Sequence, residues 1–283
     1  MIDRRFGVST HLFHEHRLTR EHLVHVAAHG FEVLELFATR AHFDYRSQET
    51  VAQLAEWLSD AHLELHSMHA PIVEAMRNGQ WVGSFSTASG DEARRRAAVA
   101  EIEAALAVAR TIPFRYLVIH LGVPSAVPAP PLDNQLHAAV QSVEEIDAFA
   151  ATVGVKVALE VIPNRLSSAA ELVRLIEEQL EGTSVGVCLD YGHAHLMGDV
   201  GEAIEMLSGH LWTTHVHDNR GQRDDHLAPF AGTIDWPAAM METQKIGYDD
   251  VLMFEVADTG DPIGVLRRCV AAREKLEKTL VTL

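Results

Sequence analysis

The sequence has few cysteines and no long apolar run. Only Cys188 and Cys269 occur among its 283 residues, which is too few for a disulfide framework and is typical of a reducing compartment. No stretch approaches the roughly 20 apolar residues of a membrane span, and the first residues contain no apolar signal core. We therefore expect a cytoplasmic protein without a membrane partner.

Basic residues are also in short supply. The chain has 23 Lys and Arg against 40 Asp and Glu, which gives a formal net charge of −17. This charge opposes contact with phosphate backbones, so we expect no nucleic-acid partner. It is compatible with bound metal ions, because these cancel the charge of the carboxylates around them. The first expected strand is not followed by the GxGxxG turn of dinucleotide-binding sheets.

Hydrophobic residues make up 47% of the chain and no linker divides it, so residues 1–283 are expected to form a single domain. Short apolar runs alternate with longer amphipathic segments, which is the pattern of repeated βα units. The expected strands are residues 6–10, 31–37, 63–68, 116–121, 155–161, 184–189, 211–216 and 251–256. The expected helices are residues 19–29, 47–61, 91–111, 133–153, 167–180, 199–207, 235–246 and 263–280, with caps at Asp91, Asp133, Ser167, Asp199 and Asp235. Eight such pairs favour an α/β fold of one (β/α)8 TIM barrel over an open doubly wound sheet.

In such a barrel, functional side chains collect where strands end and βα loops begin. Polar residues stand at or near the ends of six expected strands: His69, His120, Glu160, Asp190, His215 and Glu255. His193 follows three residues after Asp190, and the loop after the seventh strand carries Asp224 and His226. A lone histidine at a strand end is more often a hydrogen-bonded rim residue than a ligand, so the prediction depends on the set.

The carboxylates of this set are its most informative members. Glu160 in Val-Ala-Leu-Glu-Val-Ile and Glu255 in Leu-Met-Phe-Glu-Val-Ala are embedded in apolar strands. An ionised group there is costly unless it is paired or bound to metal, and no Arg is embedded in the neighbouring strand cores. We predict that a divalent ion, Mn, Zn, Co, Mg or Fe, is bound by Glu160, Asp190, His215 and Glu255. Five further residues are expected either to complete a site for more than one ion or to hold substrate hydroxyls: His69, His120, His193, Asp224 and His226.

Residues 215–226 concentrate six possible ligands. Side chains two apart in a strand share a face, so His215 and His217 both point into the barrel only if the strand reaches His217. If it ends earlier, one is a ligand and the other supports the site. We expect His217 to have this supporting role.

Other groups of the same kinds receive simpler interpretations. His11, His14 and His16 are expected in the first loop, His42 on the surface, and residues 94–96 on a solvated helix face. The loops 71–90 and 122–131 are long and are expected to select the substrate. The first of them carries Trp81 and Phe85 and is either a lid over the barrel mouth or a segment whose aromatic residues have a packing role.

Five segments together resemble those of the xylose isomerase-like TIM barrels, a superfamily that includes sugar-phosphate isomerases, epimerases and the endonuclease IV group. The segments are residues 157–160, 187–194, 215–219, 224–227 and 232–236, and the resemblance covers most of the chain. Its most specific part is an Asp-x-x-His at 190–193 followed by a His-x-His-Asp at 215–218.

The resemblance to the ketose epimerase branch implies that one ion is held by Glu160, Asp190, His215 and Glu255. It also implies that the two glutamates move protons and that His193 orients a substrate hydroxyl. We therefore expect a divalent-metal-dependent isomerase or epimerase that acts on a sugar or sugar phosphate through an enediolate. The basic residue that this branch places shortly after the strand-seven histidine has two candidates here, Arg220 and Arg223, and the resemblance implies that such a residue contacts the site or the substrate.

The resemblance to the endonuclease IV branch implies an alternative, a multi-zinc phosphoesterase. That branch uses nine ligands, and the sequence offers a residue for each: His69, His120, Glu160, Asp190, His193, His215, Asp224, His226 and Glu255. The charge of −17 argues against DNA as the substrate. A barrel that binds metal and a carbohydrate without turning it over is a third possibility, and the sequence leaves open whether the chain forms a homo-oligomer.

Overall fold

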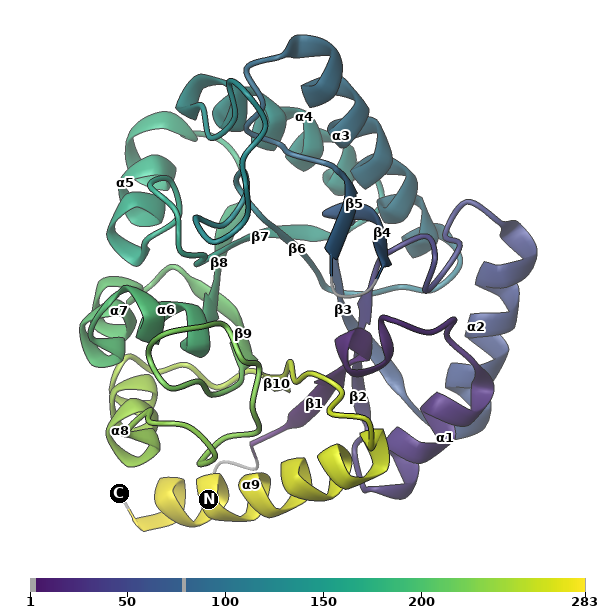
Figure 1. The fold of residues 1–283 in the computed structure, drawn as a ribbon, viewed down its shortest axis with the longest axis vertical. Helices are drawn as coiled ribbons and strands as arrows, with labels where there is room; N and C mark the ends of the chain where they lie inside the picture. Colours follow the sequence, from purple (N-terminus) through teal and green to yellow (C-terminus); the bar gives the residue numbers. More distant parts are fainter. Residues whose placement is uncertain (1–3, 78–79, 283) are drawn as a thin grey trace.

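The computed structural model describes residues 4–77 and 80–282, and within them eight parallel strands close into a barrel (Figure 1). The order around the barrel is β1-β10-β9-β8-β7-β6-β3-β2. Its strands are β1 (Phe6–Ser9), β2 (Val33–Phe37), β3 (Glu64–His69), β6 (Tyr116–Ile119), β7 (Lys156–Glu160), β8 (Val185–Asp190), β9 (Leu211–Val216) and β10 (Leu252–Phe254). The predicted (β/α)8 barrel is confirmed; β9 occupies the expected residues and the other strands differ only at their ends.

Helices surround the barrel as an outer ring (Figure 1). They are α1 (Arg20–Ala28), α2 (Gln48–Ala61), α3 (Glu92–Leu106), α4 (Leu136–Thr152), α5 (Ala169–Gln179), α6 (Tyr191–Met197), α7 (Val200–Met206), α8 (Trp236–Lys245) and α9 (Pro262–Thr282), with 3-10 turns η1 (Thr10–Phe13) and η2 (Ala107–Arg110). Asp91, Asp199 and Asp235 cap helices as predicted. The caps predicted at Asp133 and Ser167 are wrong, because α4 begins after Gln135 and α5 after Ser168. The Asp133 carboxylate instead accepts hydrogen bonds from Ser86 and the Asn134 amide.

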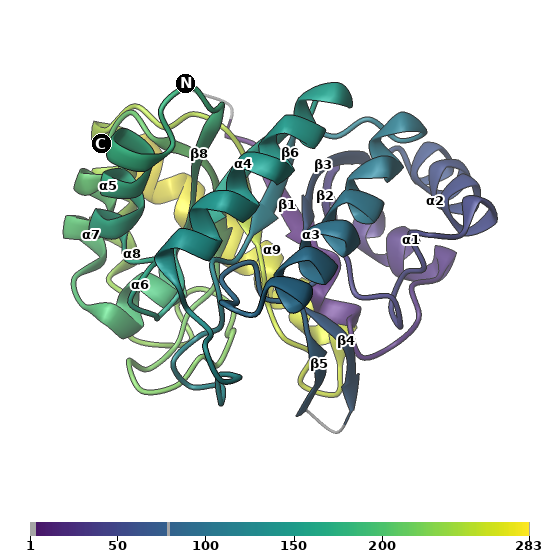
Figure 2. The same ribbon diagram turned by 90° about the horizontal axis from the view of Figure 1, so that it is seen from above.

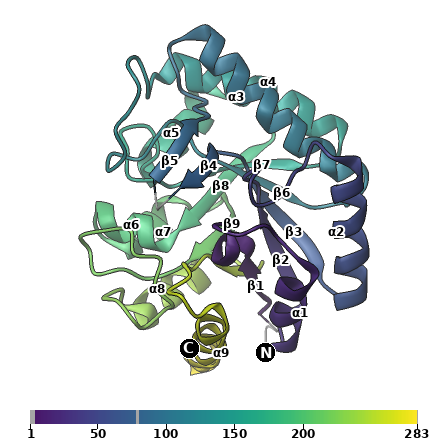
Figure 3. The ribbon, with the colours of Figure 1, turned by 45° about the vertical axis from the view of Figure 1, so that its right-hand side comes forward.

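The expected loop 71–90 contains a β-hairpin instead of irregular chain. Its strands are β4 (Val73–Arg77) and β5 (Gln80–Ser84), which pair antiparallel. The hairpin projects from the same end of the barrel as the long loops, away from the N-terminus (Figures 2 and 3). Ile72 and Val73 at its base line the cavity described below. The Trp81 side chain lies outside the described part of the structure, so the candidate lid stays a prediction.

The barrel interior is closed below its C-terminal end by apolar side chains. Val118, Ala158 and Cys188 pack together from three adjacent strands, and Val33, Val251 and Met253 form a second cluster. Because successive residues of a strand alternate between the two faces, the inward position two residues beyond Ala158 is Glu160, and that beyond Cys188 is Asp190. The apolar core therefore lies directly below the polar side chains at the C-terminal ends of the strands.

Two expectations about surface residues are wrong. His42 is buried, and its Nδ1 lies 2.6 Å from the carbonyl oxygen of His16. Arg95 is also buried, and its guanidinium reaches Glu92 at 2.9 Å and Glu145 at 3.0 Å, whereas Arg94 and Arg96 of the same run are exposed as expected. Within the described residues, no helix is both long and apolar enough to cross a membrane.

Candidate metal centre

The C-terminal ends of the strands surround a cavity of about 130 Å³. Seven of the nine predicted ligand residues line it, together with residues of the first loop and the hairpin base. The lining residues are His11, His14, Phe37, His69, Ile72, Val73, His120, Pro124, Glu160, His193, Asp224, His226 and Glu255. Asp190 and His215 lie in the same clusters of donor atoms, so the structure brings all nine residues together.

Four residues from adjacent strands form what we name the inner group: Glu160, Asp190, His215 and Glu255. One donor atom from each lies within 4.8 Å of the others, and all four residues are buried. His215 Nδ1 is 3.4 Å from Glu160 Oε1, 3.4 Å from Glu255 Oε2 and 3.9 Å from Asp190 Oδ2. Three carboxylates and one imidazole thus converge on one small space.

A second group shares Glu160 with the first and consists of His69, His120 and Glu160. Glu160 Oε2 lies 3.1 Å from His69 Nε2 and 3.1 Å from His120 Nε2, and the two nitrogens are 3.3 Å apart. Donor atoms bound to one ion at about 2.1 Å are separated by about 3.0–3.4 Å when they subtend angles of about 90–110°. The spacing of this triangle is that of ligands around a common ion.

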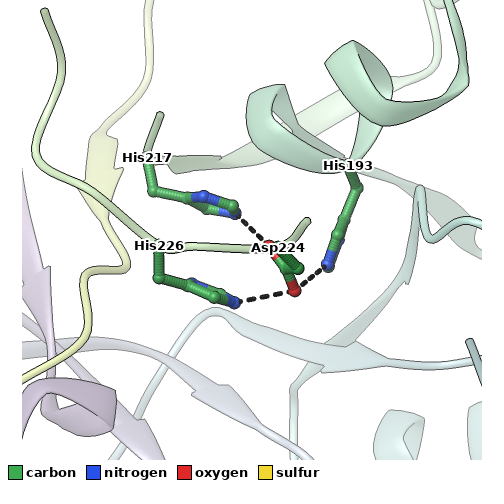
Figure 4. Close-up of side chains that lie close together, drawn as sticks. All are labelled: His193, His217, Asp224 and His226. Carbon is green, nitrogen blue, oxygen red and sulfur yellow. Dashed lines mark hydrogen bonds and ion pairs between the residues drawn. The ribbon is translucent and has the colours of Figure 1, made fainter. Parts of the chain in front are cut away.

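The outer group comes from helix α6, which follows β8, and from the chain after β9, and it consists of His193, His217, Asp224 and His226 (Figure 4). Asp224 Oδ2 is 3.0 Å from His193 Nε2 and 3.1 Å from His226 Nε2. His217 Nε2 is 3.9 Å from Asp224 Oδ1 and only 2.9 Å from the Asp190 carboxylate. His217 therefore lies closer to the Asp190 carboxylate of the inner group than to Asp224. The other two histidines of the outer group, His193 and His226, both contact Asp224.

Backbone carbonyls orient three of the imidazoles. The Nδ1 atom of His69 lies 2.8 Å from the Ala70 carbonyl oxygen, that of His193 3.1 Å from Val161, and that of His226 2.9 Å from Glu255. A carbonyl oxygen only accepts, so Nδ1 carries the proton in each ring and Nε2 keeps a free lone pair when the ring is neutral. All three Nε2 atoms face the carboxylates of the site, which is how metal-ligating histidines are held.

The loop after β9 returns Asp224 and His226 to the barrel because Asp218 ties it down. The buried Asp218 carboxylate accepts hydrogen bonds from the indole of Trp236 at 2.9 Å and from the Gly232 amide at 3.0 Å. Its backbone also pairs with Leu227 in both directions, at 2.7 and 2.8 Å. This anchoring brings the chain back just after His226, beside the end of β10.

The electrostatics of the site reflect its buried carboxylates. Burial raises the pKa of Glu160, but His120 and His215 outweigh it and hold that pKa well below its usual range. Burial lowers the pKa of His226, yet Asp224 raises it to about 10. Burial raises the pKa of Glu255, and although His215 opposes this, the nearby Glu160 adds to it. The negative charge of these carboxylates thus favours a positive charge in the cavity, and a divalent cation would supply it.

Unsatisfied buried atoms provide the test of whether a metal fits. Both carboxylate oxygens of Glu160 and the Nδ1 atom of His215 are buried and have no hydrogen-bond partner. Buried polar groups without a partner cost about 1–3 kcal/mol each. These atoms are donors of the inner and second groups, and nitrogen with carboxylate oxygen suits a divalent transition metal. The residues present therefore fit the predicted ion.

Not every predicted residue reaches the cavity. The side chains of Arg220 and Arg223 are 62% and 83% exposed and point toward Asp225, at 4.0 and 3.6 Å. Neither belongs to the described residues that line the cavity, so the predicted contact with the site is not found. The sequence expectations also missed two features: His11 and His14 line the cavity, and the buried Glu35 of β2 lies against His215. Glu35 carries the same signal as Glu160, a carboxylate within an apolar strand.

The chain belongs to the xylose isomerase-like TIM barrel family, and the model of this family matches residues 23–277. An uncharacterized protein of Methanocaldococcus jannaschii, MJ1311, is 27% identical over 98% of this chain and 96% of its own length. The inosose isomerase of Bacillus velezensis is 22% identical over 81% of this chain and 79% of its own. Among solved structures, a D-tagatose 3-epimerase-like protein aligns with a TM-score of 0.78 at 24% identity, over 98% of this chain and 97% of its own. The IolI protein with a bound zinc atom aligns at 0.75 and 20% identity, over 98% of each chain.

Proposed function

We propose that this protein is a divalent-metal-dependent isomerase or epimerase of a sugar or sugar phosphate. The observation that carries the proposal is the inner group, in which two buried glutamates from β7 and the end of β10 converge on one space with Asp190 and His215. Support comes from the names of similar proteins, an inosose isomerase and an epimerase-like barrel.

Glu160 and Glu255 are the proposed proton carriers. A carbon atom seated between them, beside a carbonyl, loses its proton to one carboxylate and regains a proton from the other, on the opposite face or on the neighbouring carbon. General acid–base transfer of this kind contributes about 10²–10⁴-fold to rate. Phe37, Ile72 and Pro124 contribute apolar side chains to the cavity wall beside these carboxylates.

Glu160, Asp190, His215 and Glu255 would hold the metal ion. When bound, a divalent cation acts as a Lewis acid that stabilises negative charge on the substrate's carbonyl oxygen as the enediolate develops. His193, whose Nε2 faces Asp224, is the residue we propose to hold a substrate hydroxyl beside the inner group. His69 and His120 stand on the other side of Glu160 and offer the same contacts there.

The test is exchange of solvent deuterium into a panel of free and phosphorylated ketoses. The wild-type protein should incorporate deuterium beside the carbonyl of at least one sugar, and Glu160→Gln and Glu255→Gln should each reduce the rate by at least about 10²-fold. Glu181→Gln, which alters an exposed glutamate after α5, is the matched control and should leave the rate unchanged. Failure of the wild-type protein to exchange a proton in any sugar of the panel would count against the proposal.

The second candidate is a multi-zinc phosphoesterase. One observation favours it. The second and outer groups lie on either side of the inner group, so the site offers three neighbouring groups of ligand atoms, one for each of three ions. Zinc content per chain after dialysis, measured together with hydrolysis of a phosphate monoester and diester panel, separates the candidates. One tightly held ion with deuterium exchange supports the isomerase, whereas three zinc ions with phosphate release and no exchange support the phosphoesterase.

A further inference from the structure

Glu35 lies inside the barrel, where an unpaired carboxylate is costly. It belongs to β2 and is fully buried, with no exposed surface. The register between β2 and β3 shifts at Leu34 and Glu35, and beyond this irregularity Glu35 pairs with Ser67. The shift places the two side chains together, and Ser67 Oγ donates a hydrogen bond to Glu35 Oε2 at 2.8 Å.

The same carboxylate oxygen contacts His215, 180 residues further along the chain. His215 Nε2 lies 3.1 Å from Glu35 Oε2, and both side chains are fully buried. The opposite ring atom, Nδ1, faces the inner group at 3.4 Å from Glu160 and from Glu255. Each ring nitrogen of His215 therefore faces carboxylates: Nε2 faces Glu35, and Nδ1 faces the glutamates of the inner group.

This arrangement fixes the ring chemically. An ionised carboxylate only accepts hydrogen bonds, so Glu35 places the imidazole proton on Nε2 and leaves the lone pair on Nδ1. We infer that Glu35 is a positioning residue that holds the His215 ring in the tautomer and orientation in which Nδ1 serves the inner group. The inference rests on the proposed metal-dependent function, because it assigns the His215 nitrogen that faces the ion.

A purely structural role explains Glu35 less well. Its second oxygen, Oε1, is buried without a hydrogen-bond partner, and buried ionic pairs are often replaceable by apolar residues without loss of stability. An apolar residue at this place would leave the Nε2–H group of His215 without an acceptor and the ring free to rotate. Carboxylates that accept from metal-bound histidines typically change metal affinity by 10–100-fold when they are replaced.

The test is Co²⁺ binding, measured by competition with a chelator and by the visible spectrum of the bound ion. Glu35→Gln should raise the Kd about 10–100-fold and alter the Co²⁺ absorption bands. Glu32→Gln, which changes an exposed glutamate just before the same strand, should do neither. A Kd and spectrum of Glu35→Gln equal to those of the wild-type protein would overturn the inference.

A second variant covers the case in which Glu35→Gln does not fold. Ser67→Ala keeps the carboxylate but removes the hydroxyl that fixes it, and it should raise the Kd several-fold with altered bands. An unchanged Kd and spectrum in Ser67→Ala would then overturn the inference. If the wild-type protein itself fails to bind Co²⁺ or Zn²⁺, the proposed function fails together with this inference, whereas equal binding by wild type and variants removes only the role of Glu35.

Discussion

His193 Nε2 lies 3.0 Å from Asp224 Oδ2, although His193 belongs to helix α6 after β8 and Asp224 to the loop after β9 (Figure 4). The contact exists because Asp218 draws the loop after β9 back over the site. It joins the outer group to the inner group, since the Nδ1 atom of the same His193 lies 3.2 Å from Glu160 Oε1. One imidazole thus connects a loop carboxylate with the proposed proton carrier.

Asp224→Asn removes the charge shared by His193 and His226, and we expect the metal-free protein to lose stability. Hydrogen bonds to charged groups contribute about 1.5–3 kcal/mol, and about 1 kcal/mol corresponds to about 2–4 °C in the melting temperature of a chain of comparable size. The melting temperature, measured by circular dichroism, should fall by at least about 3 °C. Asp225→Asn on the same loop affects only pairs with exposed arginines and should have a smaller effect. Equal shifts in the two variants would contradict this account of the outer group.

Gly192→Ala should displace His217. A Cβ atom at this position of α6 would lie 2.0 Å from His217 Cε1, so the ring must move away from Asp190. Overpacking of this kind costs about 1–3 kcal/mol, and urea unfolding should show a loss of that size. In Gly201→Ala, a substitution in the neighbouring helix α7, the nearest atom is 3.1 Å away, and we expect a change within about 1 kcal/mol. A Gly192→Ala protein as stable as the wild type would show that His217 is not held there.

The buried Glu101 of α3 is expected to make the free energy of unfolding decrease at acidic pH. Burial raises its pKa, but hydrogen bonds from Arg46, at 2.7 Å, and Tyr45, at 2.6 Å, lower it below the ordinary value. A lowered folded-state pKa means that the stabilisation is complete above the unfolded value of about 4.3 and is lost as the pH falls through the folded pKa. Glu101→Gln should therefore lose less unfolding free energy than the wild type between about pH 5 and pH 3.

Glu103 on the same helix provides a control, because its pKa is shifted in the opposite direction to that of Glu101. Burial raises its pKa and Glu145 adds to the shift, so this group favours the folded state more as the pH falls. Glu103→Gln removes that contribution and should make the decline in stability toward acid slightly steeper than in the wild type. The same urea titrations measure both variants, and a shallower decline in Glu103→Gln would contradict the assignment.

Much of the site could be predicted from strand ends, because a barrel gathers them at one rim regardless of loop detail. Glu160 and Glu255 were recognisable as carboxylates within apolar strands. The same criterion applies to Glu35 in Val33–Phe37, but its role depends on a register shift with β3 and on a contact with β9, which no local pattern contains. His11 was assigned to the first loop; it lies in η1 and lines the cavity, with its ring centroid 4.7 Å from that of His226.

The loops were less predictable than the barrel. Residues 73–77 and 80–84 pair as the strands of a hairpin, and the sequence between them is Asn78-Gly79, a dipeptide favoured in two-residue hairpins. These strands are too short and polar to show a clear alternation of apolar and polar residues. Arg220 and Arg223 fail to reach the cavity because the returning loop turns them toward Asp225 and solvent. The positions of such side chains depend on where a loop is anchored, here by Asp218, and spacing along the chain does not contain that information.

The most direct test of the central proposal is deuterium exchange into the ketose panel by wild-type protein before chelation, after chelation and after reloading with Mn²⁺, Co²⁺ or Zn²⁺. The account predicts exchange beside the carbonyl of at least one sugar, its loss when the metal is stripped, and its return on reloading in the wild type but not in Glu160→Gln. Exchange that persists undiminished in the stripped protein, or metal-loaded protein that exchanges no proton in any sugar of the panel, would contradict it.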